Sequence, residues 1–254
     1  MEDELGKLDG KIAVITGAAS GIGAGISTAF ANEGAVVILV DLVEEAGFSA
    51  TVSSIVALGS DSYHTYRCDI SDEDQVAAMA SWVKDTVGDV DIVVNNAGIF
   101  IESSVVDMTT AIWDKVLGVN LRGTFLVTRA FLRSMIERKS GKIINIASQL
   151  AQIGGTEASA YAASKGGVIS FTKSLAREVA TLGISVNAIA PGPIKTPLLD
   201  GETAEWRERK LAELPIGRFG EVAEVVPTAI LLASDDGSYY VGAVLGPNGG
   251  DVMN

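Results

Sequence analysis

The 254-residue chain has a formal net charge of −13, with 48% hydrophobic and 20% charged residues, an ordinary balance for a soluble α/β protein with a full core. An acidic chain without a Lys/Arg-rich block repels a phosphate backbone, so nucleic acid is excluded as the main partner. Cys68 and His64 are the only cysteine and histidine, so we expect neither an internal disulfide nor a bound metal.

The first residues, MEDELGKLDGK, lack the basic region and the apolar run of a signal peptide. The sequence contains no run of about 18 apolar residues, so no membrane span is predicted. A cytoplasmic location is therefore expected.

Short apolar, β-branched runs alternate with longer stretches of helical periodicity. The runs are KIAVIT, AVVILV, IVVNN, KIINIAS, ISVNAIA and GAVLG, and SYHTYRCDI, which contains His64 and Cys68, also reads as a strand. Helices are predicted at about 21–33, 44–58, 72–87, 109–138, 157–181 and 221–233, the fourth kinked near Gly118 or Gly123. The pattern predicts one Rossmann-type α/β domain, residues 1–254, with a doubly wound parallel sheet of about seven strands.

The segment 191–220 interrupts this alternation with four prolines, a Trp and a charged patch. It is too long for a simple connection, and long loops in compact domains usually act as lids or binding loops. We expect it to cover the substrate.

A glycine-rich turn joins the first predicted strand to the first predicted helix. Gly17, Gly21 and Gly23 lie in TGAASGIG, where glycines let backbone amides approach a pyrophosphate at a helix N-terminus. The next strand ends in Asp41, whose carboxylate can bind ribose hydroxyls and would repel a 2′-phosphate. The pattern predicts a dinucleotide site that prefers NAD to NADP.

Tyr161 and Lys165 stand four residues apart in SAYAASKGG, so their side chains share one helical face. Ser148 precedes them, at the end of the strand KIINIAS. With TGAASGIG, CDI, NNAG, VN and PGPIKT in the same order, these motifs resemble the short-chain dehydrogenase/reductase family along nearly the whole chain. The resemblance implies an alcohol dehydrogenase or ketone reductase with Asn120, Ser148, Tyr161 and Lys165 as its catalytic set.

The resemblance also implies a role for each catalytic residue. Tyr161 exchanges a proton with the substrate, Ser148 steadies the substrate oxygen, and Asn120 helps to organise a water that relays the proton from Lys165. A free tyrosine has a pKa near 10. We expect the Lys165 ammonium and an oxidised nicotinamide ring to lower the pKa of Tyr161.

Contacts with the cofactor and the substrate are implied in the same way. The residues expected to bind the cofactor are Gly17, Ser20, Gly21, Ile22, Gly23, Asp41, Leu42, Asp69, Ile70, Asn96, Ala97, Gly98, Tyr161, Lys165, Pro191, Gly192, Ile194 and Thr196. Those expected to bind the substrate are Ser148, Gln149, Gln152, Gly154, Tyr161, Leu198 and Trp206, with Ile99, Phe100 and Leu199 as further candidates. Arg207, Arg209 and Lys210 either grip an anionic substrate or form a solvated helix face.

Three functions remain open. The first is an NAD-dependent dehydrogenase of a secondary alcohol, polyol or sugar-like compound. The second is a 3-oxoacyl thioester reductase, to which SLAREVA, Arg129 and Arg133 point, and the third is a non-catalytic NAD-binding sensor or scaffold.

Family members are commonly homotetramers, and a homotetramer is expected. In LGPNGGDVMN, Asn248 stands where many relatives have an acidic residue, a departure expected to affect subunit packing.

Overall fold

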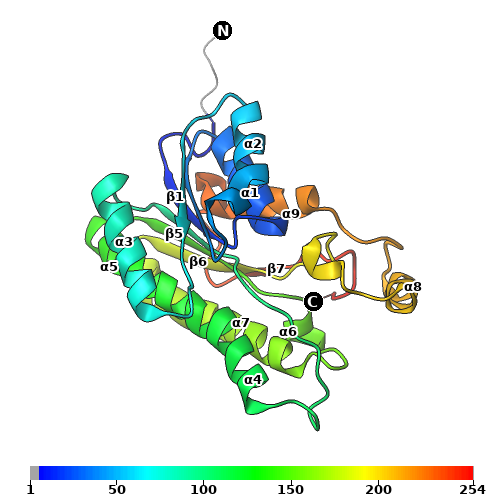
Figure 1. The fold of residues 1–254 in the computed structure, drawn as a ribbon. Coiled ribbons are helices and arrows are strands. Elements are labelled where there is room, and N and C mark those ends of the chain that lie inside the picture. Colours follow the sequence, from blue (N-terminus) through cyan, green and yellow to red (C-terminus); the bar gives the residue numbers. More distant parts are fainter. Residues whose placement is uncertain (1–5, 254) are drawn as a thin grey trace.

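The structure, a computed structural model, describes residues 6–253. Its centre is a parallel sheet of seven strands in the order β3-β2-β1-β4-β5-β6-β7 (Figure 1). The strands are β1 (Ile12–Thr16), β2 (Val36–Asp41), β3 (Tyr63–Arg67), β4 (Ile92–Asn95), β5 (Gly141–Ile146), β6 (Ile184–Ile189) and β7 (Val244–Leu245). The predicted doubly wound parallel sheet is confirmed.

Helices cover both faces of the sheet. In Figure 1, α1, α2 and α9 lie on one face, and α3, α5 and α7 lie on the other. The α-helices are α1 (Gly21–Asn32), α2 (Ser49–Ala57), α3 (Glu73–Thr86), α4 (Thr110–Leu117), α5 (Thr124–Arg138), α6 (Leu150–Ile153), α7 (Ser159–Val179), α8 (Ala204–Glu213) and α9 (Val222–Ala233). Short 3-10 turns occupy Glu45–Phe48, Ala180–Leu182, Pro197–Leu199 and Asp235–Gly237.

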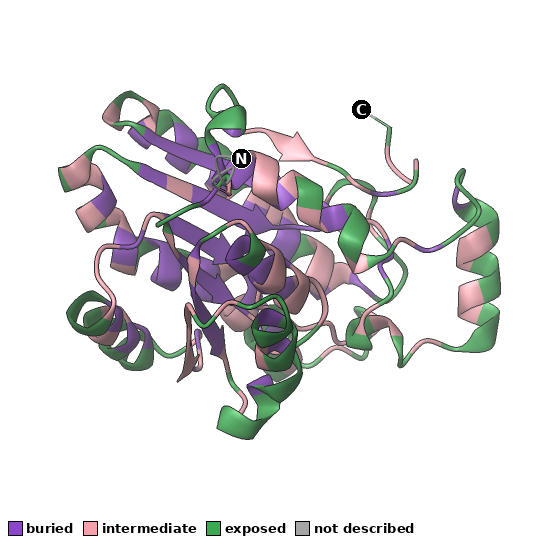
Figure 2. Ribbon diagram, turned by 90° about the horizontal axis from the view of Figure 1, so that it is seen from above, coloured by how far each residue is buried: buried purple, intermediate pink, exposed green. Residues whose placement is uncertain are grey.

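The alternation of side chains along each strand builds two hydrophobic cores. In β1, Ala13 and Ile15 pack with α1 and α9, whereas Val14 packs with α3 and α5 on the opposite face. All three residues are fully buried, and Figure 2 shows buried residues concentrated on the strands. Burial on both faces explains why the strands read as continuous apolar runs.

The structure differs from the predicted helices at three places, one of them the short helix α6, which was not predicted. The predicted helix 109–138 is α4 and α5 joined by a π-helix, Gly118–Gly123, which lies where the kink was expected. The segment 191–220 contains α8, a helix capped by the Thr203 side chain. Cys68 lies one residue beyond β3, so its placement within a strand was wrong by one position.

A chain of buried amides and hydroxyls joins the sheet to two helices. The Asn95 Nδ2 atom donates to Thr128 of α5 at 2.9 Å and to Asn145 of β5 at 2.8 Å. Asn145 in turn donates to Thr172 of α7 at 2.8 Å. Because buried polar groups are costly without partners, this chain fixes the positions of α5 and α7 relative to β4 and β5.

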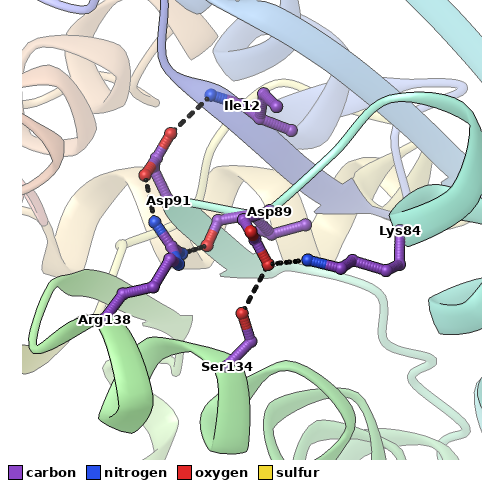
Figure 3. Close-up of polar contacts among 7 residues, drawn as sticks. Ile12, Lys84, Asp89, Asp91, Ser134 and Arg138 are labelled. Carbon is purple, nitrogen blue, oxygen red and sulfur yellow. Dashed lines mark hydrogen bonds and ion pairs between the residues drawn. The ribbon is translucent and has the colours of Figure 1, made fainter.

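A polar cluster lies at the amino-terminal ends of the central strands, where β4 begins (Figure 3). The Arg138 guanidinium pairs with Asp91 at 2.9 Å and donates to the Val90 carbonyl, and Asp91 also accepts a hydrogen bond from the Ile12 amide at 3.1 Å. Lys84 pairs with the neighbouring Asp89 at 2.6 Å. The Asp91–Arg138 pair therefore connects β1, β4 and α5 far from the carboxyl ends of the strands.

Within residues 6–253, none of the helices has both the length and the apolar character needed to cross a membrane.

We expect Arg138→Met to lower the free energy of unfolding by about 2 kcal/mol, because it leaves a partly buried carboxylate and a carbonyl without their donor. Urea denaturation measures the change. Arg133→Met, an exposed site on the same helix, is the matched control and should stay within about 0.5 kcal/mol of the parent. Equal losses from the two substitutions would contradict the structural role of the cluster.

Candidate active site

The carboxyl ends of β1, β2, β4 and β5 border a cavity of about 1010 Å³. The strand order reverses between β1 and β4, and open parallel sheets bind ligands outside the strand ends at such a point. All but one of the residues predicted to bind the cofactor line this cavity: Gly17, Ser20, Gly21, Ile22, Asp41, Leu42, Asp69, Ile70, Asn96, Ala97, Gly98, Tyr161, Lys165, Pro191, Gly192, Ile194 and Thr196. Gly23 is the exception.

The glycine turn after β1 depends on close backbone packing. Gly17 has a φ of 66°, and a Cβ atom there would lie 2.8 Å from the Cα of Ala97. A Cβ at Gly23 would lie 2.1 Å from the Gly17 carbonyl oxygen, so Gly23 is needed for packing and not as a cavity wall. The Asn96 amide donates to the Gly17 carbonyl at 3.1 Å. The turn leads into the N-terminus of α1, a position that suits a pyrophosphate.

Asp41 ends β2 at the rim of the cavity. Its carboxylate accepts hydrogen bonds from the Ala19 amide at 3.0 Å and the Leu42 amide at 2.7 Å. Sequence reasoning found no cation beside it, but strand pairing sets Arg67 of β3 opposite Asp41. Arg67 is engaged with Glu44 at 2.8 Å and with the Leu42 carbonyl at 3.1 Å.

The predicted catalytic side chains converge at the other end of the cavity. Ser148 follows β5, and α7 carries Tyr161 and Lys165 along one side. The Lys165 Nζ atom donates to the Ile146 carbonyl at 2.7 Å and lies 5.8 Å from the centre of the Tyr161 ring. The Phe100 ring packs edge-on against Tyr161, with 5.1 Å between ring centres. The phenol is therefore held between an aromatic edge and a buried ammonium.

Burial controls protonation in this part of the site. Removal from water raises the pKa of Tyr161 to about 12, and a hydrogen bond with Ser148 acts in the opposite direction. Burial lowers the pKa of Lys165 to about 8. In the protein alone, desolvation of the phenol dominates. The expectation that Lys165 and an oxidised nicotinamide ring together lower the pKa of Tyr161 stays a prediction. A positive charge bound next to the phenol is then needed to favour the phenolate.

Asn120 lies in the π-helix and is fully buried. Its side chain clamps Ile99: Oδ1 accepts from the Ile99 amide at 2.8 Å, and Nδ2 donates to the Ile99 carbonyl at 3.0 Å. Nδ2 also donates to Ser164 of α7 at 3.0 Å. Asn120 thus joins the loop after β4 to the helix that carries Tyr161 and Lys165. The water relay expected from the sequence stays a prediction.

Comparisons with known proteins agree with this geometry. The family profile described as Enoyl-(Acyl carrier protein) reductase matches residues 17–251. The 3-oxoacyl-acyl-carrier-protein reductase FabG of Thermotoga maritima is 40% identical, over 97% of this chain and 100% of its own. The chain is a member of the short-chain dehydrogenase/reductase family.

Solved structures place it in the same family. The crystal structure of levodione reductase superposes with a TM-score of 0.91 and 36% identity, over 96% of this chain and 98% of its own. A second structure is that of a Beutenbergia cavernae protein provisionally assigned as an NAD(P)-dependent gluconate 5-dehydrogenase, with NADP bound at low occupancy. It also superposes with a TM-score of 0.91 and 36% identity, over 96% of this chain and 97% of its own. The protein is an oxidoreductase of this family, whose members bind a nicotinamide cofactor.

Several residues that the family resemblance assigned to the substrate lie elsewhere. Leu198, with Ile99 and Leu199, lines the cavity, as do Ser148 and Tyr161. Five others do not line it. Gln149 is buried beside Ser148, Gln152 faces a separate hollow between α6 and α7, Gly154 has open space around it, Trp206 stacks on Phe219, and Phe100 packs against Tyr161. Sequence position alone could not show which face of α6 or α8 meets the cavity.

The anion-binding alternative for Arg207, Arg209 and Lys210 gains no support from their positions, and Arg209 is exposed outside the cavity. Arg207 donates to the Leu199 and Glu202 carbonyls, and Lys210 pairs with Asp251 at 2.6 Å. Neither Arg207 nor Lys210 lines the cavity. Sequence reasoning missed four cavity residues from α4 and the π-helix, Asp114, Lys115, Gly118 and Val119, of which only Val119 belongs to a quoted motif.

The pKa of Lys165 has a consequence for stability. Because the folded-state pKa is about 8 and the ordinary value is 10.5, the unfolded chain binds an extra proton between these values, so stability rises with pH there. In this pH window we expect the free energy of unfolding of the parent to rise by about 1 kcal/mol per pH unit relative to that of Lys165→Met. Denaturation across this pH range tests it. Lys173→Met changes an exposed site on α7, and its free energy of unfolding should follow that of the parent across this pH range. If the free energies of unfolding of the parent and of Lys165→Met changed equally with pH, the lowered pKa of Lys165 would be refuted.

Proposed function

We propose that the protein is an NAD(H)-dependent oxidoreductase that interconverts a secondary alcohol and its ketone. The observation that carries the proposal is one cavity that joins Ser148, Tyr161 and Lys165 to the glycine turn and Asp41. Two hydroxyls next to a buried ammonium suit proton transfer at a carbonyl oxygen. The turn and the carboxylate at the far end suit a dinucleotide.

The chain's own groups supply the proton chemistry. In alcohol oxidation the Ser148 hydroxyl holds the substrate oxygen, and Tyr161 accepts the proton of the substrate hydroxyl. The cavity residues would hold an oxidised nicotinamide cofactor, which would supply the hydride acceptor and a positive charge that favours the phenolate. Lys165, fixed on the Ile146 carbonyl, holds positive charge near the phenol. In ketone reduction Tyr161 returns the proton to the oxygen.

The choice of NAD over NADP rests on Asp41. Its carboxylate is fixed by the Ala19 and Leu42 amides and keeps lone pairs for the ribose hydroxyls, while a 2′-phosphate at the same place would meet a negative charge. The nearby Arg67 is already paired with Glu44. The site therefore favours an unphosphorylated ribose.

The apolar part of the cavity wall points to the substrate class. It is built by the apolar side chains of Ile99, Leu198 and Leu199, which suit hydrocarbon on the reacting carbon. We therefore place a 3-oxoacyl thioester first, and the name of the Thermotoga maritima relative supports this order. A polyol or sugar acid is second, supported by the Beutenbergia cavernae neighbour and by the preference for NAD, since reductive biosynthesis usually draws on NADPH.

Turnover that depends on Tyr161 tests the proposal. We expect the parent to reduce 3-oxoacyl thioesters with NADH, followed by small ketones and oxidised sugar acids. Tyr161→Phe should lower kcat by about a thousandfold, because it removes the only proton donor proposed at the substrate oxygen, without weakening NAD binding. Cofactor absorbance and calorimetry measure the two quantities. Tyr239→Phe, 99% exposed, is the control. A parent that binds NAD but turns over none of these compounds would favour the sensor or scaffold reading.

Removal of the Asp41 carboxylate tests the cofactor choice. We expect Asp41→Ser to raise the ratio of kcat/KM for NADPH to that for NADH by about tenfold or more, because a like-charge contact is lost. Asp61→Ser, an exposed site before β3, should leave the ratio unchanged. A parent enzyme that already prefers NADPH would overturn the argument from Asp41.

A further inference from the structure

The helix α8 is attached to the rest of the protein in an unusual way. It has no buried residue, whereas α7 buries eight. Figure 1 shows α8 standing away from the sheet, beside the C-terminal segment. A helix without an apolar face in a core is held by few and mainly polar contacts, so each contact carries a large share of its stability.

Besides the stacking of Trp206 on Phe219, an ion pair joins α8 to the C-terminal segment. The Lys210 Nζ atom lies 2.6 Å from Asp251, and the two side chains are only 13% and 7% exposed. Among the ion pairs of residues 6–253, this one is the least exposed. The Ile216 amide, just after α8, also donates to the Gly249 carbonyl at 3.1 Å. Loss of one partner from such a pair leaves a charge that water reaches poorly.

Asn248 forms the turn that presents Asp251 to α8. Its Oδ1 atom accepts from the Gly250 amide at 2.9 Å, and its Nδ2 atom donates to the Val252 carbonyl at 3.0 Å. The residue that departs from the usual family pattern is thus 7% exposed and structural. Its amide closes a turn three residues ahead of the carboxylate that pairs with Lys210.

The pair connects to the cavity through the next turn of α8. Arg207 lies one helical turn before Lys210 and donates to the carbonyl of Leu199 and, at 3.3 Å, to that of Glu202. Leu199 and its neighbour Leu198 line the same cavity as Tyr161. A continuous path of contacts therefore runs from Asp251 through Lys210 and Arg207 to the apolar wall of the substrate end.

We propose that Asp251 is a positioning residue for the substrate: paired with Lys210, it holds α8 in place, and α8 in turn holds the Leu198–Leu199 wall over the substrate. For its effect on turnover the inference rests on the proposed function. Its effect on α8 does not depend on any substrate. Asp251 and Lys210 do not line the cavity, so the pair acts on the site only through the Leu198–Leu199 segment.

The test compares Asp251→Asn with the parent full-length protein. We expect amide hydrogen exchange to become about tenfold faster in residues 198–213 and to stay unchanged in α7, because the helix loses its least exposed attachment. With whichever substrate the parent turns over, KM should rise by about tenfold, while kcat and the Kd for NAD stay within about twofold of the parent.

Glu213→Gln is the matched control. It removes the other partner of Lys210, an exposed carboxylate at 3.2 Å, and should change neither exchange nor KM, because exposed pairs contribute little. Lys210→Met and the double variant complete a cycle. If the two residues act as a pair, the double variant is no worse than either single variant. Additive effects, or equal effects from Glu213→Gln, would overturn the proposal.

The two proposals fail separately. If the parent turns over none of the substrates but Asp251→Asn still speeds exchange in residues 198–213, the proposed function fails and the anchoring of α8 stands. If turnover is normal and Asp251→Asn changes neither exchange nor KM, the anchoring role is wrong.

Discussion

The hydrogen bond from the Lys165 ammonium to the Ile146 carbonyl joins α7 to the end of β5, and the geometry of the site depends on it. A second buried contact, between Asn145 and Thr172, joins the same two elements further from the cavity. Together they fix the helix along the strand, so that Tyr161 meets Ser148. The ammonium leaves water to make this bond, and the same burial brings the pKa of Lys165 down to about 8.

Burial gives the two ends of the cavity different electrostatic properties. Near Tyr161 the low dielectric opposes charge on the phenol, so the protein alone keeps this side chain neutral at physiological pH. At the far end, Asp41 lies at the rim, where backbone amides and water stabilise its charge. A ligand that spans the cavity therefore meets a negative charge at one end and a neutral proton donor at the other. That asymmetry suits a dinucleotide whose reactive ring changes charge.

The sequence predicted the sheet, the order of its helices and most of the cavity, because these depend on local patterns. Strand burial on both faces produces continuous apolar runs. The positions of Gly17, Asp41 and Ser148 follow from the strand ends, and that of Tyr161 follows from its helical spacing to Lys165. Contacts between distant segments could not be predicted from the sequence. The pairing of Arg67 with Glu44 requires the strand register. The direction of the Tyr161 pKa shift requires the depth of burial, and Trp206 was misplaced because no local pattern shows which face of α8 meets Phe219.

The Asp91–Arg138 cluster lies at the edge of the sheet opposite the cavity (Figure 3). Contacts that hold β1, β4 and α5 together are thus separated in space from those that meet a ligand, and effects of distant sites on stability usually add independently. Substitutions in the walls of the cavity can therefore accumulate while the stabilising contacts of the Asp91–Arg138 cluster stay unchanged. Such a division allows one scaffold to acquire new substrates through many small changes, because a destabilising change near the ligand can be offset by a stabilising one at the distant edge.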